Sequence, residues 1–559
     1  MSQSNIKMFN TVGPCVPGEH YTLPVLSRLP EDDINQMIDG KFYFVLHAPR
    51  QSGKTTYLKL LTNKINSDGN YYALFCSLAS LSNITDRSEA VTTIFDQINQ
   101  GMSNSQISLI KNKADTYNSL PGISSPSRKI RIILSNLCED LDKDLIVFFD
   151  EADCLAEDGL ITFLTQLRDG YIDRSEPGNK FPRSIALVGM RDIRDYLRHV
   201  RPDSASKNLA SPFNIKKEAF TLANFTRSEI GTLYRQHTIA SGQVFDDSAI
   251  DRAWYWSEGQ PWLVNALAYE IVVKILQNDY QATIDVKLMD QAAEALIERR
   301  DTHIDSLLER LKDPMVAKVI NGVIAGESLK GSIYIDDRKY CLDLGLVAKD
   351  ADNNLRLANP IYQEVISRLL TDPLQEILKT STEIFTWNDG QIVFISEILK
   401  KYQDFWRKNA FSFPLRINEP QIASFKNKID SLGDKAVILE ILTLVSRKYD
   451  EAAYSIILLA FLQRVASGGA RVDRKFAEGR GAAFLRVSFK ERAYLIECKI
   501  SGRSTVEQSV SQLAGNLDTE GEKEGWLVFF DRDRTKKWED KIYWDTQEFE
   551  GKTIHVIGC

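Results

Sequence analysis

The sequence predicts an α/β protein whose first part is a parallel β-sheet with helices on both faces. Short apolar runs alternate with segments of helical periodicity, and this order gives a parallel sheet. The chain has 559 residues, 43% hydrophobic and 26% charged, so about two to four globular domains are expected. The apolar runs, each expected to be a buried strand, are residues 41–47, 71–78, 145–150 and 184–190.

The sequence pattern changes three times along the rest of the chain. The strand pattern ends near residue 215, and Thr226 and Glu229 then have the spacing of a capping box at the start of a helical part. Later helical stretches precede a short hairpin pattern, which suits a winged helix, and strand-like runs return near the end. The expected division is an N-terminal segment (1–40), an α/β core (41–223), a helical lid (224–300), a winged-helix domain (301–372), a helical connector (373–440) and a C-terminal α/β domain (441–559).

The composition limits the classes of protein to which this chain can belong. The net charge of -7 does not favour wholesale coating of nucleic acid or of an anionic membrane, although a local basic patch is compatible with it. The 7 cysteines are scattered without the spacing of a zinc site, which suits reduced thiols. The N-terminus lacks an export signal, and no run of about 18 apolar residues occurs. A cytoplasmic protein without membrane spans is expected.

One motif predicts nucleotide binding. The residues APRQSGKT follow the first predicted strand and precede a helical segment, which is the context of a phosphate-binding loop, with Ala48 at the usual first glycine. Gly53 lets the backbone approach phosphates, and Lys54 is placed to reach the β and γ phosphates. The Thr55 hydroxyl can ligate Mg²⁺, and Thr56 can help to close the site. ATP and Mg²⁺ are therefore the expected ligands.

The run LIVFFDEAD supplies the acidic half of such a site. Asp150 ends a buried strand, where its carboxylate can hold magnesium, and Glu151 follows, where its carboxylate can polarise the attacking water. Arg191 follows the fourth predicted strand and is a candidate sensor of the γ-phosphate; a solvated surface arginine is an equal alternative. Arg198 and Arg201 are candidate arginine fingers.

Several blocks together resemble a known family. The segments APRQSGKTT, LIVFFDEAD, SPFNI, GQPWLVN and LANPIYQEVI look like those of AAA-like P-loop ATPases related to the archaeal and STAND groups, over residues 8–370. The resemblance implies that Gly259 and Pro261 lie in the lid and face the nucleotide, coupling its state to domain arrangement. It also implies that His20 and Tyr21 lie near the adenine.

The last hundred residues are similar to a PD-(D/E)xK nuclease-like domain, a restriction-endonuclease-like α/β fold. The matching blocks, in order, are DEAAYSIILLAFLQRVASGG, FAEGRGAAFL, LIECKI, SVSQLAGNLD, GWLVFFDRDRTKKW and GKTIHVIGC. Such folds bind Mg²⁺ through carboxylates on adjacent strands and use a lysine to position water. Glu497 and Lys499 supply one carboxylate and the lysine on the same strand face. Glu451, as a metal ligand, and Gln512 match accessory positions.

One departure from that pattern leaves three interpretations open. Phe484 stands where the metal-binding aspartate is expected, and phenylalanine cannot coordinate Mg²⁺. The tail is then an active nuclease with a displaced acid such as Asp473 or Glu478, an inactive fold that binds DNA, or a fold that binds protein. Residues 471–503 hold nine Lys or Arg against four Asp or Glu, which favours a phosphate-facing surface over a merely solvated strand face.

Two functions are compatible with these patterns. The first is an ATP-binding and ATP-hydrolysing switch that controls a DNA-engaging, nuclease-like C-terminal domain; the resemblance implies a setting in defence or mobile-element DNA processing. The second is a STAND-like signalling or scaffold ATPase whose tail is catalytically inactive and binds protein. Partners are accordingly DNA, other proteins or further copies of the chain. A basic groove in the tail would favour the first function.

Overall fold

The structure is a computed structural model, and it divides the chain into two compact units. Unit 1 comprises residues 1–298 with 343–345, and unit 2 comprises residues 299–342 with 346–559. Each is described by itself. The described residues are 6–29, 31–82, 84–118, 125–190, 215–299, 310–311, 313–324, 335–350, 353–366, 368, 395–409, 450–465, 471–476, 483–489, 492–501, 505–531, 533 and 535–559.

Unit 1 contains a five-stranded parallel sheet in the order β2-β3-β4-β1-β5. The four predicted strands are confirmed, and β3 and β4 are buried along their whole length, as their continuous apolar runs require. The fifth strand, β5, pairs with β1 at the edge of the sheet and was not predicted. The strands are β1 (Tyr43–His47), β2 (Tyr72–Ser77), β3 (Leu145–Asp150), β4 (Ser184–Gly189) and β5 (Lys216–Thr221).

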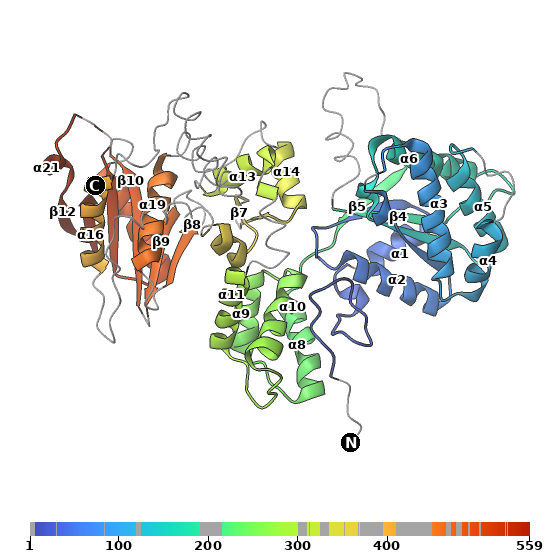
Figure 1. The fold of residues 1–559 in the computed structure, drawn as a ribbon, viewed down its shortest axis with the longest axis horizontal. Helices are drawn as coiled ribbons and strands as arrows, with labels where there is room; N and C mark the ends of the chain where they lie inside the picture. The colour runs from blue at the N-terminus through green and yellow to red at the C-terminus, as the bar shows by residue number, and fades with distance from the viewer. Residues whose placement is uncertain are drawn as a thin grey trace. The chain divides into compact units, whose positions relative to one another are not determined.

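Helices cover both faces of this sheet, as predicted (Figure 1). Alternate residues of one strand enter different cores: Tyr43 and Val45 pack with α3, α5 and α6, whereas Phe44 and Leu46 pack with α1 and α2. The sheet is therefore enclosed by two apolar layers. The helices are α1 (Glu31–Asp39), α2 (Lys54–Asp68), α3 (Arg87–Ser103), α4 (Ser108–Asn118), α5 (Lys129–Asp140) and α6 (Glu157–Asp173).

Four helices and a π-helical turn follow β5, in the part expected to form a lid. We call α8, α9, α10 and α11 the lid helices. Their bounds are α8 (Arg227–Ser241), α9 (Asp247–Ser257), α10 (Pro261–Tyr269), the turn η4 (Glu270–Ile275) and α11 (Val286–Arg299). Buried aromatic side chains such as Tyr234 and Trp256 fill the space between them. The predicted capping box is confirmed, because Thr226 and Glu229 satisfy each other's backbone N–H groups at the start of α8.

We expect Thr226→Ala to destabilise unit 1 by about 1 kcal/mol, because an N–H group at the first turn of α8 loses its acceptor. For a unit of this size the thermal midpoint should fall by roughly 2–4 °C, measured by circular dichroism or calorimetry. Thr232→Ala is the matched control: its hydroxyl only donates to the Ser228 carbonyl within the same exposed helix face. An equal loss in both variants would contradict the capping role.

Unit 2 begins with helices followed by a short hairpin. The described elements are α13 (Pro314–Ile324), α14 (Ile335–Asp343), β6 (Val347–Lys349) and β7 (Leu355–Leu357). The two strands pair antiparallel, with Val347 opposite Leu357. The described elements follow the predicted order of helices and then a hairpin, and the winged-helix domain itself stays a prediction.

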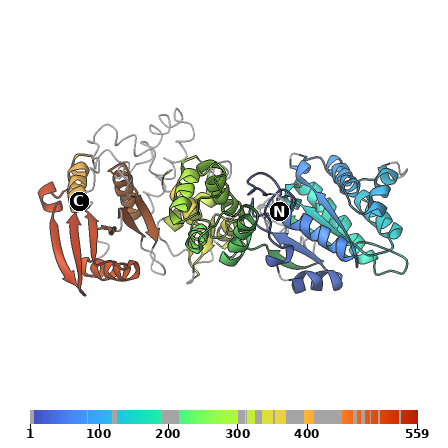
Figure 2. The ribbon, with the colours of Figure 1, turned by 90° about the horizontal axis from the view of Figure 1, so that it is seen from below.

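The C-terminal part of unit 2 is a six-stranded mixed sheet in the order β12-β13-β11-β10-β9-β8, drawn in orange to red in Figures 1 and 2. Strands β10, β11 and β13 are mutually parallel, and β8 and β9 add antiparallel pairs beside β10, while β12 pairs antiparallel with β13. The elements are α19 (Asp450–Val465), β8 (Arg471–Phe476), β9 (Ala483–Phe489), β10 (Arg492–Ile500), α20 (Val506–Glu520), β11 (Glu524–Phe530), α21 (Trp538–Lys541), β12 (Trp544–Phe549) and β13 (Lys552–Gly558).

Helix α16 (Ile395–Asn409), in the region expected to be a connector, packs on this sheet. The buried Tyr402 ring contacts Phe461 of α19 and Phe530 of β11. The Gln403 amide donates to the Tyr543 and Gly558 carbonyls at 3.1 and 2.6 Å. On the other face, α20 packs against the sheet through Leu513 and its neighbours. None of the helices in the described ranges is long and apolar enough to cross a lipid bilayer.

Candidate nucleotide site

The predicted phosphate-binding loop joins β1 to α2. Gly53 caps the helix with φ 80°, a left-handed conformation that glycine adopts without strain, and Gln51 has φ 56°. Ala48 is buried, and its N–H donates to the Gly189 carbonyl at 3.2 Å, so the start of the loop is tied to the end of β4. The N–H groups at the start of α2 are therefore available to an anion.

Lys54 is held inside the loop by backbone carbonyls. Its ammonium donates to the carbonyl oxygens of Ala48 and Pro49, both at 2.7 Å. Burial lowers the pKa of Lys54 to about 8, and the nearby carboxylate of Asp150 opposes the fall. The side chain is therefore still mainly protonated at neutral pH, and an anionic ligand would favour the charged form further.

Thr55 and Asp150 meet directly. The Thr55 hydroxyl donates to the Asp150 carboxylate at 2.6 Å, although 95 residues separate them in sequence. Asp150 is only 1% exposed, and burial raises the pKa of its carboxyl, while the Thr55 hydrogen bond and the Lys54 charge oppose the rise. The two predicted oxygen ligands for a magnesium ion are thus brought together at the ends of β1 and β3.

Glu151 occupies the turn after β3. It has φ 58°, and its N–H donates to Asp150 Oδ1 at 3.0 Å, so the turn is fixed by the preceding acid. Its side chain lines the same cavity as Lys54, and burial raises the pKa of the Glu151 carboxyl, with smaller contributions from Asp150 and Asp153. A carboxylate of raised pKa beside a phosphate site suits proton abstraction from water.

Asp153 is a structural member of the site for which the sequence suggested no role. Its Oδ2 accepts from the Met190 N–H at 2.9 Å, and a Cβ on Gly189 would approach its Oδ1 to 2.8 Å. Asp153 therefore fixes the end of β4 beside the acidic turn. In the sequence, the one hint of this contact is that Asp153 belongs to the acidic run LIVFFDEAD.

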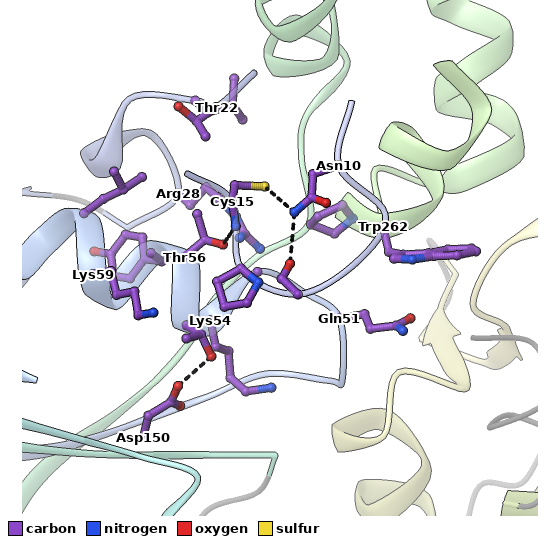
Figure 3. Close-up of a pocket in the computed structure, with 18 of the residues that line it drawn as sticks. Asn10, Cys15, Thr22, Arg28, Gln51, Lys54, Thr56, Lys59, Asp150 and Trp262 are labelled. Atoms are coloured by element: carbon purple, nitrogen blue, oxygen red, sulfur yellow. Dashed lines mark hydrogen bonds between the residues drawn. The ribbon is translucent and has the colours of Figure 1, made fainter. Parts of the chain in front are cut away.

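These residues surround a cavity of about 590 Å³ within unit 1. Figure 3 shows Lys54 and Asp150 beside each other, with Asn10 and Trp262 farther along the wall. The wall near Lys54 is polar, and the N-terminal segment and α10 form part of the remaining wall together with residues such as Phe75, Phe225 and Leu233. A cavity of this size can hold a nucleotide. Ala48 and Gly259 are not among its lining residues, whereas Thr55, Thr56 and Pro261 are.

The N-terminal segment closes one side of the cavity. The Cys15 N–H donates to the Thr56 hydroxyl at 2.9 Å, and Trp262 Nε1 donates to the Thr11 carbonyl at 2.8 Å. The segment is therefore bonded both to the helix after the loop and to a lid helix. Through this hydrogen bond Thr56 helps to hold the N-terminal segment at the cavity. Its role in closing the site around a nucleotide stays a prediction.

His20 and Tyr21 differ in where their side chains lie relative to the cavity. Tyr21 lines the cavity, and its hydroxyl lies 3.0 Å from Nδ1 of His237 on α8. Its ring packs on Phe9 with centroids 4.8 Å apart. His20 is not a lining residue, and its Nδ1 accepts from the Val16 N–H within the segment. Of the two, Tyr21 alone is placed to meet a ligand.

Gly259 lies between α9 and α10 and contacts the chain segment that follows β5. The Phe225 N–H donates to the Gly259 carbonyl at 2.8 Å, and a Cβ on Gly259 would lie 1.8 Å from the Phe225 carbonyl oxygen. Gly259 also has φ 73°, so only glycine fits. Pro261 begins α10 and lines the cavity, whereas Gly259 lies outside the lining and contacts the Phe225 backbone.

Arg28 is a lining residue that the sequence did not single out. It follows the short η1 helix (Val25–Ser27), and its guanidinium lies over the Phe225 ring, 5.1 Å from the centroid. Among the described residues its hydrogen-bond acceptors are backbone carbonyls, and no sequence motif encodes such contacts. The candidate residues Arg191, Arg198 and Arg201 lie outside the described residues.

The second predicted site lies in unit 2. The Lys499 ammonium is 2.7 Å from Glu497 Oε1 and donates to Gln512 Oε1 at 2.9 Å, so three predicted residues are brought together between β10 and α20. Glu497 is 1% exposed. Phe484 lies opposite Glu497 in the β9–β10 register and belongs to an apolar cluster with Leu513. The position of the expected aspartate is therefore part of the core.

The other acids proposed for that site are only partly placed. Glu451 lies in α19 and Asp473 in β8, where it is opposite Arg486, but their side chains are outside the described part, as is the whole of Glu478. In the portion of the chain that the structure describes, no group of three or more His, Cys, Asp or Glu side chains is arranged to hold a metal ion.

Comparisons with known proteins give the following results. No protein-family model and no curated protein match the chain. The Walker-type ATPase paby2304 of Pyrococcus abyssi is similar with TM-score 0.43 and 15% identity, over 63% of this chain and 98% of that one. The ORC2 protein of Aeropyrum pernix, in ADPNP–ADP complexes, has TM-score 0.37 and 14% identity, over 59% and 89%. The Holliday junction branch migration motor RuvB of Thermotoga maritima has TM-score 0.32 and 13% identity, over 63% and 96%.

Proposed function

We propose that the chain is an AAA-like P-loop ATPase that binds ATP in the unit 1 cavity and hydrolyses it there. The observation that supports this most strongly is the hydrogen bond of 2.6 Å between Thr55 and the buried Asp150, beside the Lys54 ammonium and the start of α2. A hydroxyl, a carboxylate and a cation at a helix N-terminus form the donor set that a magnesium–triphosphate complex requires.

The roles follow from these positions. Lys54 and the N–H groups at the start of α2 bind and orient the phosphates, and Thr55 and Asp150 hold Mg²⁺ through oxygen ligands. When bound, Mg²⁺ neutralises charge that develops on the phosphate oxygens. Glu151 takes a proton from the attacking water. We retain Arg191 as a candidate γ-phosphate sensor, with a solvated arginine as the alternative.

Lys54→Ala is expected to weaken ATP binding by roughly 100-fold or more, because two charge-assisted contacts to phosphate are lost. Isothermal titration with ATP and with a non-hydrolysable analogue measures this directly. Lys64→Ala on the same helix is the control, since Lys64 pairs with Asp68 at 2.9 Å and does not line the cavity. Wild-type affinity in Lys54→Ala would overturn the proposed site.

Contacts with the lid helices would allow a bound nucleotide to change the position of these helices relative to the phosphate-binding loop. Pro261 and Trp262 line the cavity from α10, and the Trp262 indole is bonded to the N-terminal segment. A ligand that contacts these residues stabilises one position of α10 relative to the loop. We therefore propose that ATP acts as a switch as well as a substrate, with Gly259 and Pro261 as the connection.

For unit 2 we propose a DNA-engaging, nuclease-like domain that contains α16 and residues 450–559. Its element order is a helix, three antiparallel strands, a second helix and a parallel strand, with Glu497, Lys499 and Gln512 clustered between β10 and α20. The local excess of basic residues supports contact with phosphates. The burial of Phe484 in the core argues against cleavage.

The alternative is a signalling or scaffold ATPase whose C-terminal domain binds protein, and the same Phe484 core contact favours it over an active nuclease. Plasmid and linear DNA, incubated with Mg²⁺ or Mn²⁺ and with or without ATP, separate the three outcomes. Nicking that Glu497→Ala abolishes would establish a nuclease. Binding without cleavage would support an inactive DNA-binding domain, and neither would favour the scaffold. Lys54→Ala tests whether ATP controls either activity.

A further inference from the structure

Two backbone segments that are far apart in sequence meet at Arg28. One is the phosphate-binding loop, in which Ser52 directly precedes Gly53. The other is the linker between β5 and α8, residues 222–226, which leads from the sheet to the lid helices. The first segment forms part of the proposed nucleotide site, and the second joins the sheet to the lid helices.

The Arg28 guanidinium is bonded to both segments. Its Nη1 donates to the Ser52 carbonyl at 2.6 Å, and its Nε donates to the Ala223 carbonyl at 2.9 Å, with Nη2 as a further donor to the same oxygen. A planar guanidinium presents these donors in a fixed geometry, so the two carbonyls are held at a defined separation. A lysine ammonium is a single donor centre and cannot reproduce this arrangement.

The linker connects Arg28 to the wall of the cavity through Phe225 and Gly259. Phe225 packs under the Arg28 cation and donates its N–H to the Gly259 carbonyl at 2.8 Å. Gly259 in turn precedes Pro261, which lines the cavity from α10. A continuous series of contacts therefore runs from the loop, through Arg28 and the linker, to the part of the lid that faces the nucleotide.

Arg28 also keeps its charge at this position. Burial lowers the pKa of Arg28 to about 10, with the Glu229 carboxylate opposing the fall, so the side chain is protonated at neutral pH. Its hydrogen bonds run to carbonyls, and no salt bridge joins it to a carboxylate among the residues that the structure describes. Phosphates in the adjoining cavity would be attracted to this cation, so nucleotide binding acts on both the loop and Arg28.

We propose that Arg28 is a positioning residue that couples the phosphate-binding loop to the linker, so that nucleotide binding at the loop orders the lid helices through it. The proposal rests on the proposed ATP site and names how that site is connected to the switch. By linkage, the arrangement of the lid helices affects nucleotide affinity through the same contacts.

Amide hydrogen exchange on the full chain, with and without a non-hydrolysable ATP analogue and Mg²⁺, tests the proposal. In the wild type, nucleotide should slow exchange in the loop, residues 49–55, and in the linker. In Arg28→Met, the loop should remain protected, and the slowing of the linker should fall by roughly tenfold or more, the value of about one hydrogen bond to a charged group. Arg28→Lys should behave like Arg28→Met, although it keeps the charge.

Arg235→Met is the matched control, because Arg235 is exposed on α8 and does not line the cavity. Full nucleotide-dependent protection of the linker in both Arg28 variants would overturn the proposal. A uniform loss of linker protection with and without nucleotide would also overturn it, since that result describes a purely structural residue. Absence of loop protection in the wild type would instead refute the ATP site itself.

Discussion

Replacing Glu151 with Gln should lower the rate of ATP hydrolysis by roughly 100- to 10,000-fold while ATP affinity stays within a few-fold of the wild type. Glu151 lines the cavity, and burial together with Asp150 and Asp153 raises the pKa of its carboxyl, which makes the carboxylate a better base. Glutamine has the same size and keeps hydrogen-bonding groups, but it cannot take a proton. Binding by Lys54 and the helix start should therefore be preserved.

Steady-state phosphate release and titration with a fluorescent ATP analogue measure the two quantities separately. Glu139→Gln makes the same chemical change on α5, away from the cavity, and should leave both unchanged. Wild-type turnover in Glu151→Gln would assign the base to another group. A large loss of affinity with little change in turnover would show instead that Glu151 acts mainly in binding.

The central strands could be predicted because burial on both faces leaves a clear pattern. A run such as LIVFFD has no polar face, and β3 is buried at every position. The strand β5 lacks that pattern: it reads KKEAFT, and Lys217, Glu218 and Ala219 are exposed at the sheet edge. Only its pairing with β1 makes it a strand, and pairing is not visible in a local sequence window.

The arrangement of the polar residues at the candidate nucleotide site could be predicted for a related reason. Asp150 ends β3, and Lys54 and Thr55 begin the helix that follows β1; the carboxyl ends of parallel strands meet at one edge of the sheet. Arg28 and Trp262 could not be predicted, because their partners are backbone carbonyls of residues 24 to 251 positions away. A side chain that bonds to backbone imposes no residue type on its partner, so no motif records the contact.

The C-terminal domain shows how one residue can limit an inference from resemblance. The helix and strand blocks from 450 onward have the expected order, and Glu497, Lys499 and Gln512 are close together. Phe484 departs from the family pattern at the position of the expected aspartate, and in the structure it packs with Leu513 in the core. The aromatic segment with Tyr402, expected in a connector, packs on the same sheet because its apolar face needs a partner.

Gly259→Ala should destabilise unit 1 by at least about 3 kcal/mol, among the larger effects of a single substitution. Two costs add: φ is 73°, where an L-residue is strained, and the new Cβ would lie 1.8 Å from the Phe225 carbonyl oxygen. The contact atom belongs to backbone, so the linker itself must move. Since Pro261 and Trp262 follow directly and line the cavity, ATP affinity should fall together with stability.

Gly242→Ala separates the two costs, because Gly242 has φ 82° at the end of α8 and no atom lies within 4 Å of the added Cβ. That variant should lose only about 1 kcal/mol, the conformational part. Thermal unfolding of the full chain, followed with and without ATP, gives both values. If the two alanine variants were equally stable, the close approach of Phe225 to Gly259 would not be rigid. The lid helices could then move relative to the linker without strain. Nucleotide binding would have to affect the lid helices through contacts other than that of Phe225 with Gly259.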